Sequence, residues 1–404
     1  MAGRLSGSSR GATRPGASPR VLHVTQPVDG GVAGVVTELV RTQRAAGFDV
    51  TVACPDGGLR QALRELGADV RHWPATRAPG PSLAGEVLRL ARVVEQVRPD
   101  VLHAHSAKAG LAARLAVRGR IPTVFQPHAW SFEAVGGVTA AVASAWERWA
   151  ARWTTRVVCV SKAERARGQR AGVRAHWRVI PNGIDPVRFH PAAVAAGRPA
   201  LAPLAELDPA ALLVVCVGRL CRQKGQDVLL EAWPSVLRRV PGARLALVGD
   251  GPQERPLRHR APEGVLFTGA VADVVPWYQA ADLVVLPSRW EGMALAPLEA
   301  MACERPVLVT DVAGARESLP PGHTTHCLVP PGRPGPLADA VTRTLLDPPL
   351  RESLGAEGRR HVLAAHDVRC SAEAVADLYR ELLGVRRTVA HRPEPTECRE
   401  SIRS

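Results

Sequence analysis

The chain has 404 residues, of which 46% are hydrophobic and 22% are charged, and this composition excludes a disordered or fibrous main body. No stretch approaches the ~20 uninterrupted apolar residues of a membrane span, and the basic N-terminal segment lacks the apolar centre of a signal peptide. The formal net charge is +14, carried mainly by Arg, since Lys108, Lys162 and Lys224 are the only lysines.

The first half of the chain alternates short apolar runs with Ala-, Leu- and Arg-rich segments of helical periodicity. Such alternation predicts a parallel β-sheet with helices on both faces. The predicted strands are residues 21–25, 49–54, 68–73, 100–106, 123–128, 156–161 and 178–183.

A Pro- and Ala-rich stretch without clear period, residues 185–208, separates this half from a second alternating half. Its predicted strands are residues 212–218, 244–251, 265–269, 282–288, 306–311 and 326–330. The fold class is therefore α/β, with two doubly wound parallel-sheet domains whose facing cleft is the expected ligand site.

We expect six segments along the chain. They are a disordered basic tail (1–19), an N-terminal α/β domain (20–190), a linker (191–210), a C-terminal α/β domain (211–366), a C-terminal helix that packs back on the N-terminal domain (367–385) and a frayed tail (386–404).

The eight cysteines include no C-x-x-C pair, and several lie in apolar runs where a thiol behaves as a small buried hydrophobe. This pattern favours a reducing cytoplasm over an oxidising compartment, and it does not predict a structural zinc site.

The run from Gly218 to Gly225, GRLCRQKG, follows a predicted strand and precedes a predicted helix. Cations at the carboxyl end of a strand, beside a helix start, suit a diphosphate group. A solvated basic loop is the alternative interpretation. The scarcity of lysine elsewhere favours Arg219 and Lys224 as anion ligands.

Glu291 and Glu299 stand at the two ends of the run EGMALAPLE. On one continuous helix, they would be separated by a rise of ~12 Å, which exceeds the ~5–9.5 Å between the paired carboxylates of a glycoside hydrolase. The spacing suits two ends of an elongated ligand, a sugar at Glu291 and a ribose at Glu299. Backbone amides from Met293 to Leu295 would bind phosphates between them. An acid that complements a helix dipole is an equally open alternative.

Three further features occur in the N-terminal half. Gly30 and Gly31 follow the first predicted strand and permit close backbone approach to a phosphate, although a plain glycine turn is the alternative. His128 ends the fifth strand, where a structural role competes with a catalytic one. His103 and His105 share one face of the fourth strand but show no third metal ligand at suitable spacing.

Together these motifs resemble the family 4 retaining glycosyltransferases of the GT-B fold, from about Val21 to Leu383. The C-terminal half matches best, through GRLCRQKG, VGDGP, VLFTGAV, DLVVLPS and the E-x7-E frame. In the N-terminal half, HAHSAKAG, QPHAW, VSKAE and PNGIDPVRF also look like this family. The order and spacing of the motifs make the resemblance specific.

The resemblance implies a nucleoside-diphosphate-sugar donor bound mainly by the C-terminal domain, an acceptor bound by the N-terminal domain, and neither cofactor nor metal. Catalytic or sugar-contacting roles fall on His128, Arg219, Lys224 and Glu291. Substrate-binding roles fall on Gly30, Gly31, Arg219, Lys224, Val271, Glu291, Met293, Ala294, Leu295 and Glu299, with Val271 near the base and Glu299 on the ribose. The implied activity is retaining hexosyl transfer from a UDP- or GDP-sugar to a sugar or lipid-linked acceptor in cell-surface glycan synthesis.

Three positions depart from the family pattern. Ala294 and Glu304 stand where Gly is frequent, so the phosphate contact at Ala294 requires a negative φ and the turn at Glu304 is in question. Ala33 stands where the inositol-phosphate branch carries Asn, which makes that acceptor less favoured.

The competing functions are a GT-B sugar-nucleotide epimerase, an inositol-phosphate glycosyltransferase and a non-catalytic nucleotide-sugar-binding scaffold. The chain shows no recognisable nucleic-acid-binding motif, so basic charge alone does not predict a nucleic-acid partner.

The positive charge concentrates in residues 20–190, which carry 24 Lys and Arg against 13 Asp and Glu, whereas residues 191–404 carry 25 of each. A predicted helix there has an aromatic stripe beside a basic stripe, a pattern that suits the surface of an anionic membrane. The alternative is that the aromatic side chains are core. We therefore expect a cytoplasmic protein with a possible peripheral membrane location. The stripes are Trp146, Trp149 and Trp153, and Arg148, Arg152 and Arg156.

Overall fold

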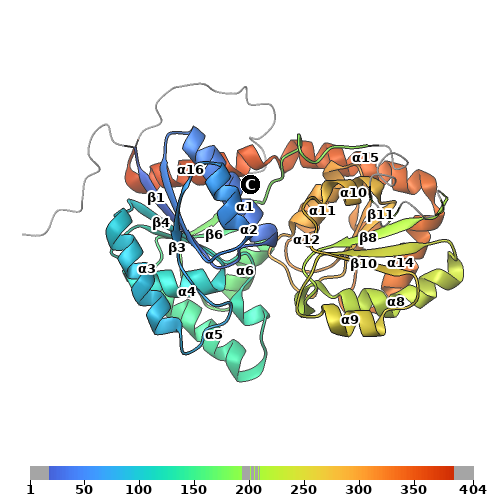
Figure 1. Cartoon of the computed structure of the whole chain (residues 1–404), viewed down its shortest axis with the longest axis horizontal. Coiled ribbons are helices and arrows are strands. Elements are labelled where there is room, and N and C mark those ends of the chain that lie inside the picture. Colours follow the sequence, from blue (N-terminus) through green and yellow to red (C-terminus); the bar gives the residue numbers. More distant parts are fainter. Residues whose placement is uncertain (1–17, 193–200, 202–203, 205–207, 209, 386–404) are drawn as a thin grey trace, which may run out of the picture.

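The computed structural model describes residues 18–192, 201, 204, 208 and 210–385, which form two α/β domains side by side (Figure 1). Residues 1–17 and 386–404, and most of the expected linker, lie outside the described residues. The predicted fold class is confirmed, and each predicted apolar run overlaps a strand.

The N-terminal domain has a seven-stranded parallel sheet in the order β3-β2-β1-β4-β5-β6-β7. Its strands are β1 (Arg20–Thr25), β2 (Asp49–Cys54), β3 (Asp69–His72), β4 (Val101–His105), β5 (Thr123–Gln126), β6 (Arg156–Cys159) and β7 (Trp177–Val179). The connecting helices are α1 (Gly30–Ala45), α2 (Gly58–Glu65), α3 (Leu83–Val97), α4 (Ser106–Val117), α5 (Gly137–Ala150) and α6 (Lys162–Arg170).

The C-terminal domain has a six-stranded parallel sheet in the order β10-β9-β8-β11-β12-β13. Its strands are β8 (Leu213–Val217), β9 (Arg244–Val248), β10 (Val265–Gly269), β11 (Leu283–Leu286), β12 (Val307–Thr310) and β13 (Leu328–Val329). Its helices are α8 (Gln226–Arg239), α9 (Glu254–Arg260), α10 (Val275–Ala280), α11 (Leu295–Ala302), α12 (Ala315–Ser318), α13 (Thr324–Cys327), α14 (Pro334–Leu346) and α15 (Pro348–Ala365).

Helices cover both faces of each sheet, which explains why the central strands are apolar throughout instead of alternating. In β8, Val215 and Val217 join the apolar cluster on one face, while Val214 and Cys216 join the cluster on the other. Each domain therefore has two apolar layers, and the sheet between them fixes where the loops at its edge emerge.

The strand order reverses direction beside β1 in the first sheet and beside β8 in the second. Ligands of such sheets bind at this reversal, outside the carboxyl ends of the strands. The loops that leave β1 and β8 there begin the runs at Gly30 and Gly218, and β4 and β11 supply the neighbouring loops.

The chain returns to the N-terminal domain at its end, through α16 (Val368–Leu383), which packs on α1 (Figure 1). Tyr379 of α16 is fully buried in the same apolar cluster as Val36 and Val40 of α1. At the crossing, the amide of Ile184 donates to the carbonyl of His366 at 2.8 Å, and the amide of Val368 donates back to Ile184 at 3.0 Å.

Candidate active site

The N-termini of α1 and α11 face each other across the two domains. A Cβ atom placed on Gly31 would lie 3.6 Å from Leu295 Cδ1, so the glycine backbone reaches the first residue of α11. Gly30, with φ of 73°, begins α1, and Ala294, with φ of −71°, precedes α11. The first amides of a helix lack intrahelical acceptors, and such amides are suited to bind an anion.

Glu291 lies in the loop before α11, which begins at Leu295, so Glu291 and Glu299 do not share one continuous helix. Its buried carboxylate accepts hydrogen bonds from Lys224 Nζ at 2.6 Å and Ser288 Oγ at 2.7 Å, and from Gln223 Nε2 at 3.3 Å. These contacts fix one orientation of the carboxylate at the carboxyl end of β11.

Lys224 and Arg219 both follow β8 but differ in their surroundings. Burial opposes the charge of Lys224, but the adjacent Glu291 carboxylate outweighs that effect, so the pKa of Lys224 is raised. Lys224 therefore stays protonated at neutral pH. Arg219 is exposed at the mouth of the loop, and its carbonyl accepts from Gln226 Nε2 at 3.0 Å, which ties the loop to the start of α8.

Glu299 is on α11, and Val271 follows the edge strand β10. Tyr278 donates its hydroxyl proton to Glu299 Oε2 at 2.7 Å. Burial raises the pKa of Glu299, although this hydrogen bond partly offsets the shift. Val271 and Glu299 belong to the half of the site in which the sequence predicts a nucleoside.

His128 follows β5 with a positive φ of 57°, and it brings the N-terminal domain into contact with the Glu291 loop. A Cβ atom on Gly292 would lie 3.0 Å from the His128 carbonyl carbon and 2.9 Å from Glu164 Oε1. No larger residue fits at Gly292 without movement of this junction. His128 and Glu291 are therefore on neighbouring loops from opposite domains.

Further interdomain contacts involve residues that the sequence analysis did not select. Ser161 Oγ donates to the carbonyl of Gly292 at 3.0 Å, and Asn182 Nδ2 donates to the carbonyl of Met293 at 2.8 Å. The carboxylate of Glu317 accepts from the first two amides of α6 at 2.7 and 2.8 Å. Ser161 and Asn182 lie in VSKAE and PNGIDPVRF, motifs that carried the resemblance without an assigned role.

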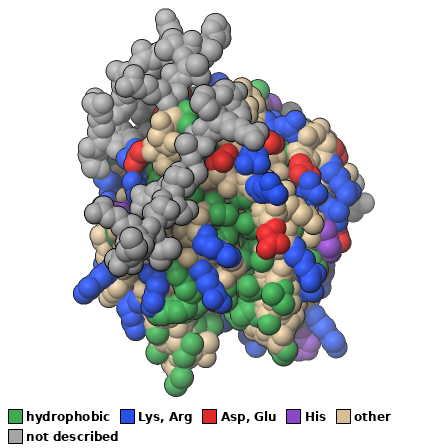
Figure 2. Space-filling model, turned by 90° about the vertical axis from the view of Figure 1, so that its left-hand side faces the viewer, with side chains coloured by type: hydrophobic (Ala, Val, Ile, Leu, Met, Phe, Trp, Pro, Cys, Tyr) green, Lys and Arg blue, Asp and Glu red, His purple; other side chains and the backbone are tan. Residues whose placement is uncertain are grey.

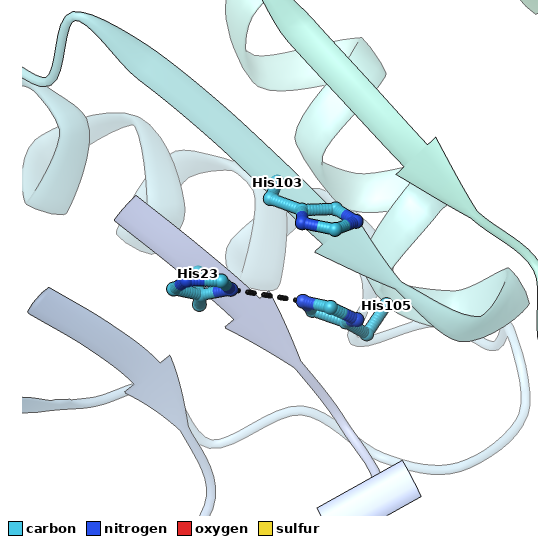
Figure 3. A group of neighbouring side chains, drawn as sticks. All are labelled: His23, His103 and His105. Atoms are coloured by element: carbon cyan, nitrogen blue, oxygen red, sulfur yellow. Dashed lines mark hydrogen bonds between the residues drawn. The ribbon is translucent and has the colours of Figure 1, made fainter. Parts of the chain in front are cut away.

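Three buried histidines lie together behind this site, so His23 is a third potential ligand beside His103 and His105, which the sequence spacing did not show (Figure 3). His23 of β1 pairs in register with His103 of β4, and the candidate ligand nitrogens of the three lie within 4.8 Å of one another. The rings of His103 and His105 lie close together, with centroids 4.0 Å apart and planes tilted by 34°. Both ring nitrogens of His23 and of His105, and Nδ1 of His103, lie within hydrogen-bond distance of other side chains, so hydrogen bonding accounts for this arrangement.

A pocket with a volume of about 590 Å³ lies elsewhere. Asp282 and Pro306, which line it, precede β11 and β12, so it is at the opposite edge of the sheet from Glu291. It is therefore separate from the site between the two domains.

Comparison with known proteins gives a consistent result for both domains. A family model described as Glycosyltransferase Family 4 matches residues 29–188, and a second, Glycosyl transferases group 1, matches residues 211–347. A GDP-mannose-dependent alpha-(1-6)-phosphatidylinositol monomannoside mannosyltransferase of Mycobacterium tuberculosis is 34% identical over 394 residues, covering 89% of this chain and 98% of the relative.

Two further proteins are similar. A D-inositol 3-phosphate glycosyltransferase of Segniliparus rotundus is 35% identical over 214 residues, which cover 49% of this chain and 44% of the relative. The crystal structure of Anabaena Alr3699/HepE in complex with UDP and glucose superposes with a TM-score of 0.77 at 23% identity, covering 90% of this chain and all of that one.

Proposed function

The chain belongs to the family 4 glycosyltransferases, and on that premise we propose that it transfers a hexose, with retention of anomeric configuration, from a nucleoside-diphosphate sugar to a sugar or lipid-linked acceptor. The enzyme class, a glycosyltransferase with the GT-B fold, follows from membership of the family. The observation that carries the finer proposal is the junction of the α1 and α11 N-termini beside Lys224 and Glu291.

The diphosphate of the donor would bind at this junction. Amides at Gly31 and at Met293, Ala294 and Leu295 offer hydrogen bonds from both sides, and the negative φ of Ala294 keeps that backbone in the required conformation. Arg219 and Lys224 supply two positive charges. The ribose would bind at Glu299, and the base would contact the main chain near Val271.

Glu291 would hold hydroxyl groups of the donor sugar, because Lys224 and Ser288 fix its carboxylate between the strand end and α11. His128 approaches from the acceptor side of the same junction. In the proposed reaction, the bond between the anomeric carbon and the diphosphate oxygen breaks, and the acceptor oxygen bonds on the same face. The acceptor proton passes to the departing phosphate.

Arg219, Lys224 and the two helix N-termini would stabilise the charge that develops on the departing diphosphate. This arrangement supplies the electrostatic role that a divalent ion fulfils in other transferases, so we propose metal-independent catalysis. A chelator control belongs in every assay of the enzyme.

GDP-mannose is the first donor to test, because the relative that matches nearly the whole chain is named for it. Its name also contains a phosphatidylinositol lipid, which supports a lipid-linked acceptor. The inositol-phosphate alternative has weaker support, since the relative of that name matches about half of this chain and Ala33 is buried on α1.

A thermal-shift screen against GDP-mannose, UDP-glucose and the free nucleotides tests donor binding. A ligand at 100 times its dissociation constant stabilises the folded state by about 2.7 kcal/mol, a readily measured shift. If no nucleoside-diphosphate sugar shifts the unfolding temperature, the proposed donor site is wrong. Incubation with donor alone separates a transferase from an epimerase, which would isomerise the sugar nucleotide without an acceptor.

We also propose peripheral binding to an anionic membrane through α5 and the segment before it, as would serve a lipid-linked acceptor. No helix among the described residues has the length and apolarity needed to span a bilayer. On α5, Val138, Val142 and Trp149 are 81%, 63% and 43% exposed. Hydrophobic side chains gather at the lower end of this face of the molecule, with basic side chains around them (Figure 2).

The three tryptophans of the aromatic stripe differ in burial, so neither the core interpretation nor the membrane interpretation applies to all of them. Trp146, Trp149 and Trp153 contact one another, with ring centroids 4.3–6.5 Å apart, but Trp146 and Trp153 are half-buried and only Trp149 is exposed. The guanidinium of Arg152 lies 4.5 Å from the centre of the Trp149 ring. Exposed valines beside an exposed Trp–Arg pair support a shallow, charge-assisted membrane contact.

A further inference from the structure

A continuous chain of hydrogen-bonded side chains runs from the interior of the N-terminal domain to His128. His128 Nε2 lies 3.2 Å from His105 Nδ1, His105 Nε2 lies 2.9 Å from His23 Nδ1, and His23 Nε2 lies 2.8 Å from Gln43 Oε1. The link between His23 and His105 is drawn in Figure 3. Gln43 is on α1, the helix whose N-terminus faces Leu295, and its side chain is fully buried.

Each imidazole in this chain is neutral at pH 7. Burial lowers the pKa of His23 to about 4 and that of His128 to about 3, and it lowers the pKa of His105 well below its usual value. A neutral imidazole has one nitrogen that donates and one that accepts. A chain of such rings therefore has a direction, and the group at its end sets that direction.

An amide oxygen accepts hydrogen bonds and cannot donate them. Since Gln43 Oε1 faces His23, the proton of His23 is on Nε2 and its Nδ1 is an acceptor. His105 must then donate from Nε2 and accept at Nδ1. By the same step His128 donates from Nε2, which leaves its Nδ1 unprotonated.

Among the four hydrogen-bonded residues from Gln43 to His128, His128 is the partly exposed one. Within the described part of the protein, Nδ1 of His128 has no hydrogen-bond partner. We propose that Gln43, acting through His23 and His105, holds His128 in the tautomer whose Nδ1 accepts a hydrogen bond from a sugar hydroxyl of the substrate. Gln43, His23 and His105 are then positioning residues. The identity of the hydroxyl-bearing ligand rests on the proposed function, but the tautomer does not.

His103 provides a comparison for the proposed effect of Gln43, because it belongs to the same histidine cluster but is not one of the hydrogen-bonded residues from Gln43 to His128. Its Nδ1 lies 2.5 Å from the hydroxyl of Tyr379 on α16, and the centre of its ring lies 4.0 Å from that of His105. Removal of the Tyr379 hydroxyl disturbs the cluster equally deeply in the core. The Tyr379 hydroxyl also interacts with the Gln43 side chain, but it is not one of the three hydrogen-bonded links between Gln43 and His128.

The test is ¹⁵N NMR of the full-length protein labelled at histidine, recorded without substrate, with the His128 signals assigned by their loss in His128→Asn. The expected spectrum shows an unprotonated Nδ1 and a protonated Nε2 for His128. In Gln43→Met, which keeps the side-chain length but removes the acceptor, both tautomers of His128 should appear. In Tyr379→Phe, the His128 spectrum should match that of the unmodified protein.

A protonated Nδ1 on His128 in the unmodified protein would overturn the proposal, as would an unchanged His128 tautomer in Gln43→Met that remains folded by circular dichroism. Kinetics with a confirmed donor provide the second readout: Gln43→Met should lower kcat more than it raises KM, while Tyr379→Phe should not. If the tautomer is as expected and no sugar nucleotide is turned over, the proposed function fails and the tautomer assignment stands.

Discussion

Lys224 Nζ lies 2.6 Å from Glu291 Oε1, and this ion pair joins the loops that leave two adjacent strands, β8 and β11. The lysine side chain is 20% exposed, and the glutamate side chain is 9% exposed, so the pair is not fully buried. A diphosphate that binds there would meet a lysine already held in place. The ammonium would then be shared between the leaving phosphate and the carboxylate of Glu291.

Substitution of Lys224 should therefore slow catalysis more than it weakens folding. Lys224→Ala is expected to lower kcat about 10²–10³-fold, because it removes charge stabilisation from the transition state. Steady-state kinetics with a confirmed donor measure the effect. Arg222→Ala is the matched control, since Arg222 is an exposed cation in the same loop, and it should retain near-normal kcat.

The same assay tests the absence of a metal requirement. EDTA is expected to leave kcat unchanged. Normal turnover by Lys224→Ala would show that this lysine has no role in the mechanism. If EDTA abolished activity and Mg²⁺ or Mn²⁺ restored it, the basic side chains of the protein would not suffice to stabilise the leaving diphosphate without a metal ion.

Glu299 provides a prediction about binding alone. Glu299→Ala should weaken GDP or UDP binding by roughly 1–3 kcal/mol, because the ribose loses hydrogen bonds to a carboxylate. This corresponds to an increase of about 5- to 150-fold in Kd, which calorimetry resolves. Glu263→Ala, at an exposed acid in the same domain, is the control. Equal affinity of Glu299→Ala and the unmodified protein would refute the ribose assignment.

Glu164 makes stability depend on pH. Burial raises the pKa of Glu164 to about 8, and its Oε1 is buried without a hydrogen-bond partner. Because the folded state binds this proton more tightly than the unfolded state, the unfolding free energy should fall as the pH rises from about 4.5 to 8, by up to about 1.4 kcal/mol per unit.

Glu164→Gln removes the titrating group, so its stability relative to the unmodified protein should increase over that range. Chemical denaturation of both proteins between pH 5 and 8 measures the difference. A stability difference that does not change with pH would mean that Glu164 is ionised in the folded protein throughout.

The apolar face of α5 predicts salt-sensitive membrane binding. Val138→Ser/Val142→Ser should reduce cosedimentation with anionic phospholipid vesicles, and high salt should reduce it further. Leu346→Ser/Leu363→Ser is the control, because these residues are 61% and 45% exposed on the C-terminal domain. Equal binding to neutral and anionic vesicles, or no binding at low salt, would rule out this surface as an electrostatic membrane contact.

Much of the fold could be predicted from the sequence because strands buried on both faces must be apolar along their length. The parallel topology then placed Gly31, Arg219 and Glu291 at carboxyl ends of strands, where sites occur. The ion pair between Lys224 and Glu291 could not be predicted, since it depends on how two loops fold against each other.

Two other features show the same limit. The sequence does not indicate that His23 lies beside His103, because their proximity requires β1 and β4 to be neighbours, and the order of strands along the chain does not show this. Glu304 stands where the family often has Gly, and it retains the left-handed turn with φ of 62°. In both cases the tertiary structure, rather than the local sequence, decides the arrangement.

The transfer reaction itself tests the central claim most directly. The protein is incubated with GDP-mannose or UDP-glucose and with phosphatidylinositol monomannoside or D-inositol 3-phosphate, and NMR assigns the anomeric configuration of the product. The account predicts release of the nucleoside diphosphate and a glycosylated acceptor with the anomeric configuration of the donor. A product of inverted configuration, or isomerisation of the sugar nucleotide that needs no acceptor, would contradict it.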